Sequence, residues 1–290
     1  MPLLPKEYFS NWYFLSLDSK RYLVSSYSET LDHQVQDVKY IQSDIGNHIV
    51  SISPKKYNLS LSSPILVIDH DDSTDDIFDL YSLALDNLSL IQTPITNTNR
   101  PNYIFKSANL QLGQECNINA QLESYEPFNT NLDYITNELD FIARLAKHYD
   151  VRFSAFGQNY LITNATLNIS VNTTANFYVS GSNNFYGNVT PLYGIHGYVV
   201  TGDVTMVVMP DQYDLLKLYN DQEPGYFVAV SEDVYITILD KSNLSAPERK
   251  IELGNFMFLP SIELNVSANQ AITAKLNFVT MFRGSSEITQ

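Results

Sequence analysis

The sequence predicts a mainly β protein made of two tandem β-sandwich or barrel domains. Each domain is predicted to carry one short flanking helix, and a linker helix is predicted to join the two. Two observations support this. Apolar and polar residues alternate along a strand pair near the C-terminus, and a similar pair occurs earlier in the 290-residue chain. Such period-two alternation is typical of strands that bury one face and leave the other in water.

The C-terminal strand pair occupies residues 259–282. Apolar Ile262 and Leu264 flank polar Glu263, and the alternation resumes after a turn predicted at 267–270. Residues 107–125 alternate with the same period. The pattern therefore predicts two amphipathic β-hairpins of similar construction.

A weak internal repeat surrounds these hairpins. Under a single offset, five residues of the first half match similar residues of the second half: Tyr22, Leu23, Val24, Tyr40 and Ile41 match Tyr160, Leu161, Ile162, Tyr178 and Val179. The shared register predicts a duplicated β unit. The predicted boundaries are an N-terminal arm (1–20), a first domain (21–130), a linker helix (131–158), a second domain (159–284) and a flexible tail (285–290). The arm has one alternative, an edge strand that closes the first core.

Helical patterns occur at three places. In residues 77–85 apolar side chains gather on one helical face, after a run of acids suited to a helix N-terminus. Residues 215–219 repeat this pattern behind Asp211 and Asp214. The linker helix rests on apolar residues at helical spacing, namely Leu132, Ile135, Leu139, Ile142 and Leu145.

Composition excludes several classes of function. The net charge is −15, which argues against direct phosphate binding because affinity for a duplex comes from Lys and Arg. The acidity serves either solubility or a surface to which a passing polyanion does not stick. Cys116 is the single cysteine, so an intrachain disulfide is impossible. No basic start with an apolar core marks a signal peptide, and no apolar run is long enough to cross a bilayer.

The residues that could carry chemistry do not form a recognised site. The densest group is the acidic stretch at 69–76, which could hold a cation through carboxylates or could cap the helix that follows. An EF-hand starting at Asp69 would need Gly and Glu where Thr74 and Leu80 stand. Nucleotide-binding and nucleophile-elbow motifs are absent. We therefore predict no catalytic, cofactor or metal site, and no enzymatic activity.

The layout resembles phage tail-tube proteins and the related baseplate hub and tube-initiator proteins. The similarity is best in residues 159–282, through VTGDVTMVV and the closing LPSIELNVSANQAITAKLNFVTMF, and looser in residues 21–125. In that family, hairpins from neighbouring subunits join into a barrel around a channel. The resemblance implies a structural virion protein, made in the host cytoplasm, that forms a ring or tube for DNA passage.

The resemblance also implies partners and lumen residues. Two units in one chain favour a trimer with pseudo-sixfold symmetry, and a hexamer of stacked layers remains possible. Further partners would be neighbouring tube, baseplate or sheath proteins, with DNA only as passing cargo and no membrane. The channel-lining residues would be the outward polar positions of the two hairpins, namely Glu263, Asn265, Thr273, Asn277, Gln111, Asn117, Asn119 and Gln121.

An alternative function of another class is also open. An aromatic, Asn-rich surface that includes Tyr186, Tyr193 and Tyr198 suits a β-sandwich module that recognises a receptor or a glycan. Such a module would be a compact monomer that binds sugar, whereas the tube protein would form a ring or polymer.

Overall fold

The fold is taken from a computed structural model of the chain. The structure describes residues 13–17, 20–32, 35–39, 48–52, 56–63, 66–68, 77–92, 103–113, 116–134, 142–144, 149–155, 157–176, 192–209, 212, 228–230, 233–240, 248–254, 256–267 and 271–281. Apart from one helix, the elements in these residues are strands, so the protein is mainly β.

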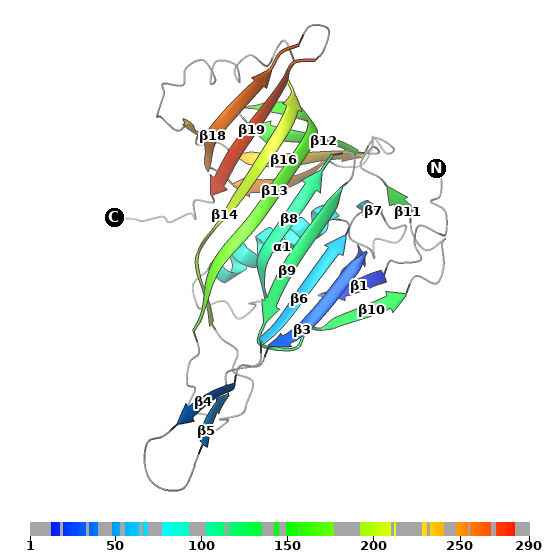
Figure 1. The fold of residues 1–290 in the computed structure, drawn as a ribbon. Coiled ribbons are helices and arrows are strands. Elements are labelled where there is room, and N and C mark those ends of the chain that lie inside the picture. The colour runs from blue at the N-terminus through cyan, green and yellow to red at the C-terminus, as the bar shows by residue number, and fades with distance from the viewer. Residues whose placement is uncertain are drawn as a thin grey trace.

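Eight antiparallel strands form one continuous sheet, which we call the wall. In spatial order they are β18 (Phe256–Asn265), β19 (Thr273–Met281), β14 (Leu192–Val207), β13 (Gln158–Asn176), β8 (Tyr103–Leu112), β9 (Asn117–Ser124), β6 (Lys56–Ser63) and β3 (Ser26–Asp32). The short β15 (Val228–Val230) pairs with part of β18. Figure 1 shows the wall running from β18 and β19 at the upper left to β3 at the lower right.

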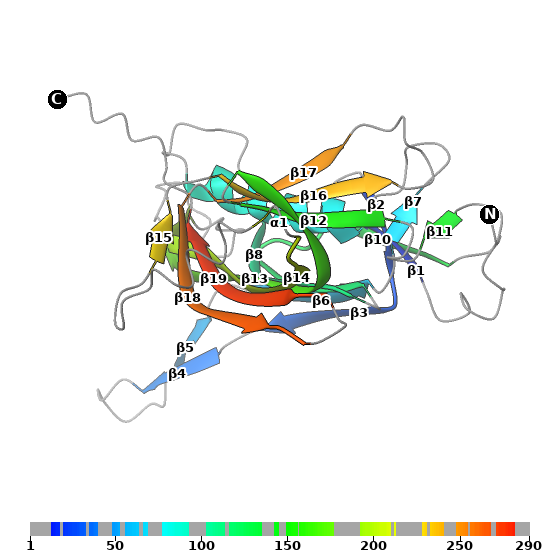
Figure 2. The same ribbon diagram turned by 90° about the horizontal axis from the view of Figure 1, so that it is seen from above.

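A second layer covers one face of the wall, as Figure 2 shows. It contains two groups of strands, which are β12 (Tyr149–Ala155) with β16 (Val234–Asp240) and β17 (Arg249–Gly254), and β10 (Thr130–Tyr134) with β1 (Tyr13–Leu17) and β2 (Lys20–Val24). Two further pairs are β7 (Leu66–Ile68) with β11 (Ile142–Arg144), and β4 (Val35–Lys39) with β5 (His48–Ile52).

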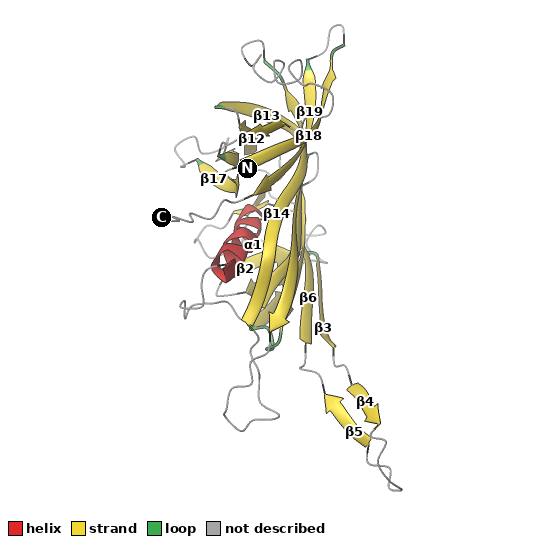
Figure 3. Cartoon of the chain, turned by 90° about the vertical axis from the view of Figure 1, so that its left-hand side faces the viewer, coloured by secondary structure: helices red, strands yellow, loops and turns green. Residues whose placement is uncertain are grey.

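The helix α1 (Ile77–Gln92) lies on the same side as the second layer (Figure 3). It packs against β8, β9 and β14. Its buried side chains recur every three or four residues, namely Ile77, Phe78, Leu80, Tyr81, Ala84, Leu85 and Leu88. Burial of this stripe, at roughly 25 cal/mol per Å² of apolar surface, holds the helix on the wall.

Strand alternation divides the wall into an inner face and a polar face. Along β9, Ile118, Ala120 and Leu122 are buried, while Asn119 and Gln121 are exposed. The inner side chains of both hairpins join a single core beneath α1 and the second layer. The hairpins predicted at 107–125 and 259–282 are confirmed as β8–β9 and β18–β19.

The two halves of the chain are not separate sandwiches. β8 of the first half pairs with β13 of the second half, from Ser107 opposite Ser170 to Leu112 opposite Ala165. The halves therefore share one sheet and one core. Within the described residues the main path of this sheet ends at β3 and β15, a branch runs from β13 through β12 and β16 to β17, and the sheet does not close into a barrel.

The predicted linker helix is wrong where the structure describes it. Leu132 lies in β10 and Ile142 in β11, and β12 follows at Tyr149–Ala155. The helical spacing of the apolar residues coincides there with short strands, because Leu132 packs against the core opposite Leu15 of β1. The other residues of that pattern, 135, 139 and 145, lie outside the described residues.

Residues 1–20 are not wholly an arm. Tyr13–Leu17 forms β1, which lies between β2 and β10 of the same chain and buries Phe14, Leu15 and Leu17. Burial of alternate apolar residues on both sides of β1 explains why the segment stays with its own core.

The helix predicted after the acidic stretch is confirmed as α1, and it continues to Gln92 rather than ending near residue 85. Its second-half counterpart at 215–219, the turn at 268–270 and the tail at 285–290 lie outside the described residues.

Candidate functional site

The polar face of the wall is its most distinctive surface. Figure 3 shows α1 and the second layer on one side of the wall, and no described element covers the other. All eight polar residues singled out in the two hairpins lie on this uncovered face: Glu263, Asn265, Thr273, Asn277, Gln111, Asn117, Asn119 and Gln121. The structure brings both sets together because β13 and β14 bridge the two hairpins.

The polar residues form rows that cross the strands. One row runs across seven strands through Ser26, Ser62, Asn119, Asn109, Asn168, Thr201 and Val279. The next runs through Asn117, Gln111, Thr166, Asp203, Asn277 and Ser261. Neighbouring strands lie about 4.8 Å apart. Each row is therefore a band made mainly of amides and hydroxyls, which includes Asp203 in the second row and ends at the apolar Val279 in the first.

These side chains hydrogen-bond to one another. Asn117 Nδ2 donates to Gln111 Oε1 at 3.1 Å, and Asn277 Nδ2 donates to Ser261 Oγ at 2.5 Å. Asn109 donates to Asn168 across the junction between β8 and β13. Mutual pairing of the amides gives an ordered polar surface without adding charge.

Charges on the polar face are few and mostly acidic. In register on it are Asp32, Asp203, Glu263, Lys56, Lys275 and Glu123. Glu123 is buried, and Lys56 Nζ and Lys106 Nζ lie 2.7 and 3.7 Å from its Oε2. Burial lowers the pKa of Lys56, but the hydrogen bond and charge of Glu123 outweigh this and leave its pKa above 10.5. This face therefore lacks the surplus of cations that a phosphate backbone requires.

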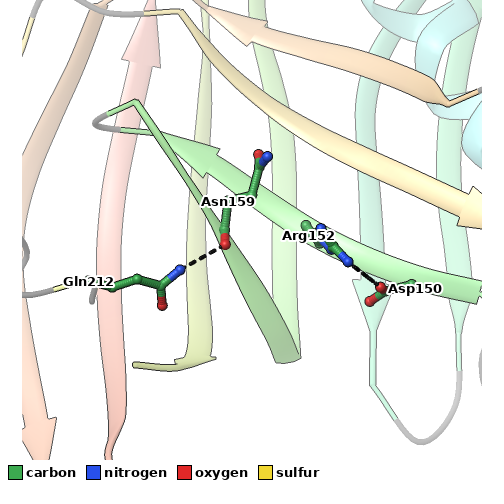
Figure 4. Close-up of polar contacts among 4 residues, drawn as sticks. All are labelled: Asp150, Arg152, Asn159 and Gln212. Atoms are coloured by element: carbon green, nitrogen blue, oxygen red, sulfur yellow. Dashed lines mark hydrogen bonds and ion pairs between the residues drawn. The ribbon is translucent and has the colours of Figure 1, made fainter. Parts of the chain in front are cut away.

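The polar contacts in Figure 4 belong to the framework of the second layer and the wall. Arg152 donates to Asp150 within β12, with Nη2 2.8 Å from Oδ2. Gln212 Nε2 donates to the carbonyl of Asn159 at 2.9 Å, while its Oε1 accepts from the amide of Met209. The Gln212 amide thus ties the chain after β14 to the start of β13.

The other groups that could carry chemistry lie partly inside and partly outside the described residues. Among the described residues, no group of three or more His, Cys, Asp or Glu side chains could hold a metal ion. The acidic stretch at 69–76 and Tyr186 lie outside the described residues. Cys116 is buried, and burial raises the pKa of its thiol against a smaller lowering by a backbone hydrogen bond from Gly113. No helix in the described chain is long and apolar enough to span a membrane.

The wall contains the same strand order twice. The first quartet is β3-β6-β9-β8 and the second quartet is β13-β14-β19-β18, each written in spatial order. In both quartets, the first two strands in chain order lie side by side, and the last two form a hairpin. The last strand of the hairpin, rather than its first, pairs with the second strand of the quartet. Each hairpin also has a register shift, between Phe105 and Ser107 in β8 and between Phe258 and Ser261 in β18.

Residue positions in the two quartets can be matched through the strand pairings. Ser107 and Ser261 are the first paired residues after the register shift, opposite Gln121 and Asn277. The strand pairings lead from Gln121 through β6 to Ser28 of β3, and from Asn277 through β14 to Thr166 of β13. Ser28 and Thr166 are therefore equivalent, and three residues further along the same strands Leu31 is equivalent to Ile169. Residues 31 and 169 are as far apart in the sequence as Tyr22 and Tyr160, so the strand registers and the sequence repeat have the same offset. Both tyrosines are buried.

The sequence pattern did not reveal the junction between β8 and β13 or the free edges of the wall. Asn109 and Asn168, which meet at the junction, stand among many asparagines and carry no distinguishing signal in the sequence. Tyr193 and Tyr198 lie in β14, the strand beside β13. A scan against models of known protein families finds no match, and a search of curated proteins also finds none.

Proposed function

We propose that the chain is a structural virion protein of a phage tail, forming a ring or tube around a channel for DNA. It is either a tail-tube subunit or a hub or tube-initiator ring. The observation that carries the proposal is the two quartets of identical strand order, joined through β8 and β13 into one wall with an uncovered polar face. Such a wall is a segment of a barrel that needs further copies to close.

The repeated order supports a duplication of one tube-like unit. Each quartet contributes four strands, and the second continues the first in the same rotational sense because β13 is antiparallel to β8. Three chains then supply six quartets around an axis, with pseudo-sixfold symmetry. Two stacked layers made by six chains are the second possible stoichiometry.

The polar face supports a lumen that does not retain DNA. Its amides and hydroxyls pair with one another, and acids outnumber the bases in register on it. DNA affinity depends on cationic side chains that release counterions, so such a surface lets a duplex pass. The inner face, with the core and α1, becomes the outside of the ring.

The mass and shape of the purified full-length chain test this function. We expect a particle three times the mass of the 32.9-kDa chain, with a central hole in electron micrographs. Six chains in two layers would also support a ring. A monomer at all accessible concentrations, with selective binding on a glycan array, would overturn the tube function in favour of a recognition module.

A further inference from the structure

The two free edges of the wall expose apolar side chains whose counterparts are buried inside it. Leu31 on β3 is 51% exposed, whereas Ile169, its counterpart on β13, is 1% exposed. Val266, just after β18, is 67% exposed, whereas Leu112, its counterpart on β8, is 2% exposed. At the internal junction, β8 and β13 cover one another. Among the described residues, an equivalent cover is missing at both edges of the wall.

The outer edge of β18 is free over the same stretch that β8 uses for pairing. β15 pairs with Met257, Phe258 and Leu259, and in the described chain no strand pairs outward with residues 261–265. The corresponding stretch of β8 begins at Ser107 and pairs with β13 through Leu112. On β3, the described chain likewise provides a partner only on the β6 side.

We propose that residues 261–266 of one copy pair with residues 27–32 of a second copy, antiparallel and in the register of the β8–β13 junction. Translated from that junction, Ile262 lies opposite Leu31, Glu263 opposite Thr30, and Val266 opposite Tyr27. This pairing rests on the proposed function for its biological setting. It defines the contact between chains, which the strand order alone does not.

The proposed pairing places like with like on both faces. Leu31 and Val266 are covered on the inner face, where Ile262 and Tyr27 already pack against the core. On the polar face, Glu263 and Thr30 take the positions that Asn109 and Asn168 hold at the internal junction. Asn109 donates a hydrogen bond to Asn168 there, and the threonine hydroxyl can likewise donate to the carboxylate of Glu263. The six-residue pairing also satisfies edge N–H and C=O groups.

Glu29 is the exception on the inner face. It is exposed and stands where β13 has the buried Leu167. The Tyr27 hydroxyl donates to Glu29 Oε2 at 2.7 Å. A charge on an edge strand disfavours unguided pairing with other strands, so Glu29 weakens the contact and restricts it to a matching partner. Replacement of Glu29 by leucine therefore strengthens assembly.

The two edges differ, so the contact is heterologous and repeats from copy to copy. Heterologous contacts close into a ring when the rotation per copy divides a full turn. Pairing of β3 with β3 of another copy would instead give a closed dimer. Cross-linking distinguishes the two because β18 and β3 lie at opposite ends of the wall (Figure 1).

Paired cysteines test the register in the full-length chain, with Cys116→Ala as background. Opposite residues in adjacent strands lie about 4.5–5.5 Å apart at Cα, within reach of a disulfide. Thr30→Cys with Glu263→Cys should therefore cross-link copies on oxidation, seen on non-reducing gels up to the ring stoichiometry. Thr30→Cys with Asn265→Cys is two residues out of register and should cross-link much less. Single-cysteine variants, checked by circular dichroism, control for folding.

The outcomes separate the pairing from the function. A ring by mass and microscopy without the Thr30–Glu263 cross-link, or with Asn265 preferred, overturns the register and leaves the tube function standing. Cross-links between two Thr30→Cys chains favour the β3–β3 dimer and overturn the pairing. A chain that stays monomeric overturns both.

Two substitutions at the edge test the same contact without cysteines. Leu31→Lys should weaken assembly at least about tenfold, because a leucine buried at the contact is lost. Leu161→Lys is the matched control, since Leu161 is 40% exposed but lies away from both edges. Glu29→Leu should shift assembly to lower protein concentration. Equal effects of Leu31→Lys and Leu161→Lys, with no gain from Glu29→Leu, overturn the proposal.

Discussion

Gly202 on β14 lies directly opposite Phe278 on β19, and the phenyl ring occupies the space that a side chain at Gly202 would need. A Cβ at Gly202 would come 2.6 Å from Phe278 Cζ and 2.7 Å from the carbonyl oxygen of Thr166. In the first quartet the corresponding pair is Leu59 opposite Leu122. The two quartets thus fill equivalent positions of the core in different ways. The second quartet uses one large side chain opposite a glycine, whereas the first uses two side chains of intermediate size.

Gly202→Ala should destabilise the fold by about 1–3 kcal/mol, because the ring could move but the Thr166 carbonyl belongs to the neighbouring strand. Denaturant unfolding of the isolated chain measures this. Gly113→Ala is the control, since its near contact is the Asn164 side-chain oxygen, which can turn away. Equal losses for the two variants would contradict the close-packing explanation.

Asn87 of α1 stabilises the start of β8 with its side-chain amide. Nδ2 donates to the Tyr103 carbonyl at 3.0 Å, and Oδ1 accepts from the Phe105 amide at 3.2 Å. Asn87→Leu should cost about 2–3 kcal/mol, because it removes two buried hydrogen bonds to the backbone of β8. Asn87→Asp should be worse at neutral pH, where a carboxylate faces the Tyr103 carbonyl, and should improve in acid, where a protonated Asp can donate. Unfolding free energies relative to wild type at both pH values measure this, and a pH-independent difference would contradict the assignment.

Part of this fold could be predicted from the sequence. The two hairpins and α1 follow from periodicities that are local and strong, such as Ile118, Ala120 and Leu122 alternating with polar residues. The polar positions placed together on one face follow from the same alternation. The offset between Tyr22 and Tyr160 also agrees with the strand registers.

The pairing of β8 with β13 could not be predicted, because it depends on a tertiary choice between edges of similar chemistry. Ala108 and Leu110 look no different in sequence from Ile262 and Leu264, and both pairs of residues lie in a hairpin. Within the described chain, however, only Ala108 and Leu110 also pair with a strand on the outer side of their hairpin, β13. The linker helix failed for a related reason. Leu132 has helical spacing to its neighbours, but its position opposite Leu15 in β1 overrides that local preference.

The Tyr81 hydroxyl is buried in the core under α1 and has no hydrogen-bond partner in the described chain. Burial raises the pKa of Tyr81, so the group stays neutral. Tyr81→Phe should stabilise the fold by about 1 kcal/mol, because it removes a desolvated hydroxyl and keeps the ring. Chemical denaturation measures the change, and Tyr81→Leu, which leaves a cavity, should be destabilising. A loss of stability in Tyr81→Phe would show that the hydroxyl has a partner.

The Lys56–Glu123 ion pair predicts a loss of stability in alkali. The pKa of Lys56 is raised above 10.5 in the folded state, so its contribution is complete below 10.5 and is lost as pH rises through the folded value. Unfolding free energies at about pH 8 and about pH 11.5 should therefore fall more for wild type than for Glu123→Gln, which removes the partner charge. The difference between the two proteins cancels the ionisation of tyrosines that Glu123 does not influence. Tyr125, whose pKa is raised by burial and by the charge of Glu123, is replaced by phenylalanine in both proteins. Parallel losses in both would contradict the contribution of this pair.

The polar face should bind DNA once it is given cations. Asn119→Lys with Gln121→Lys adds two positive charges to exposed positions of β9 on this face. We expect measurable binding of duplex DNA to the assembled particle, with a salt slope that rises by about 0.9 for each lysine that meets a phosphate. Fluorescence anisotropy at several salt concentrations measures the slope. Asn129→Lys with Asn131→Lys is the matched control, because it adds the same charge at exposed positions outside the wall. Similar binding by both variants would mean that net charge, rather than the polar face, governs contact with DNA.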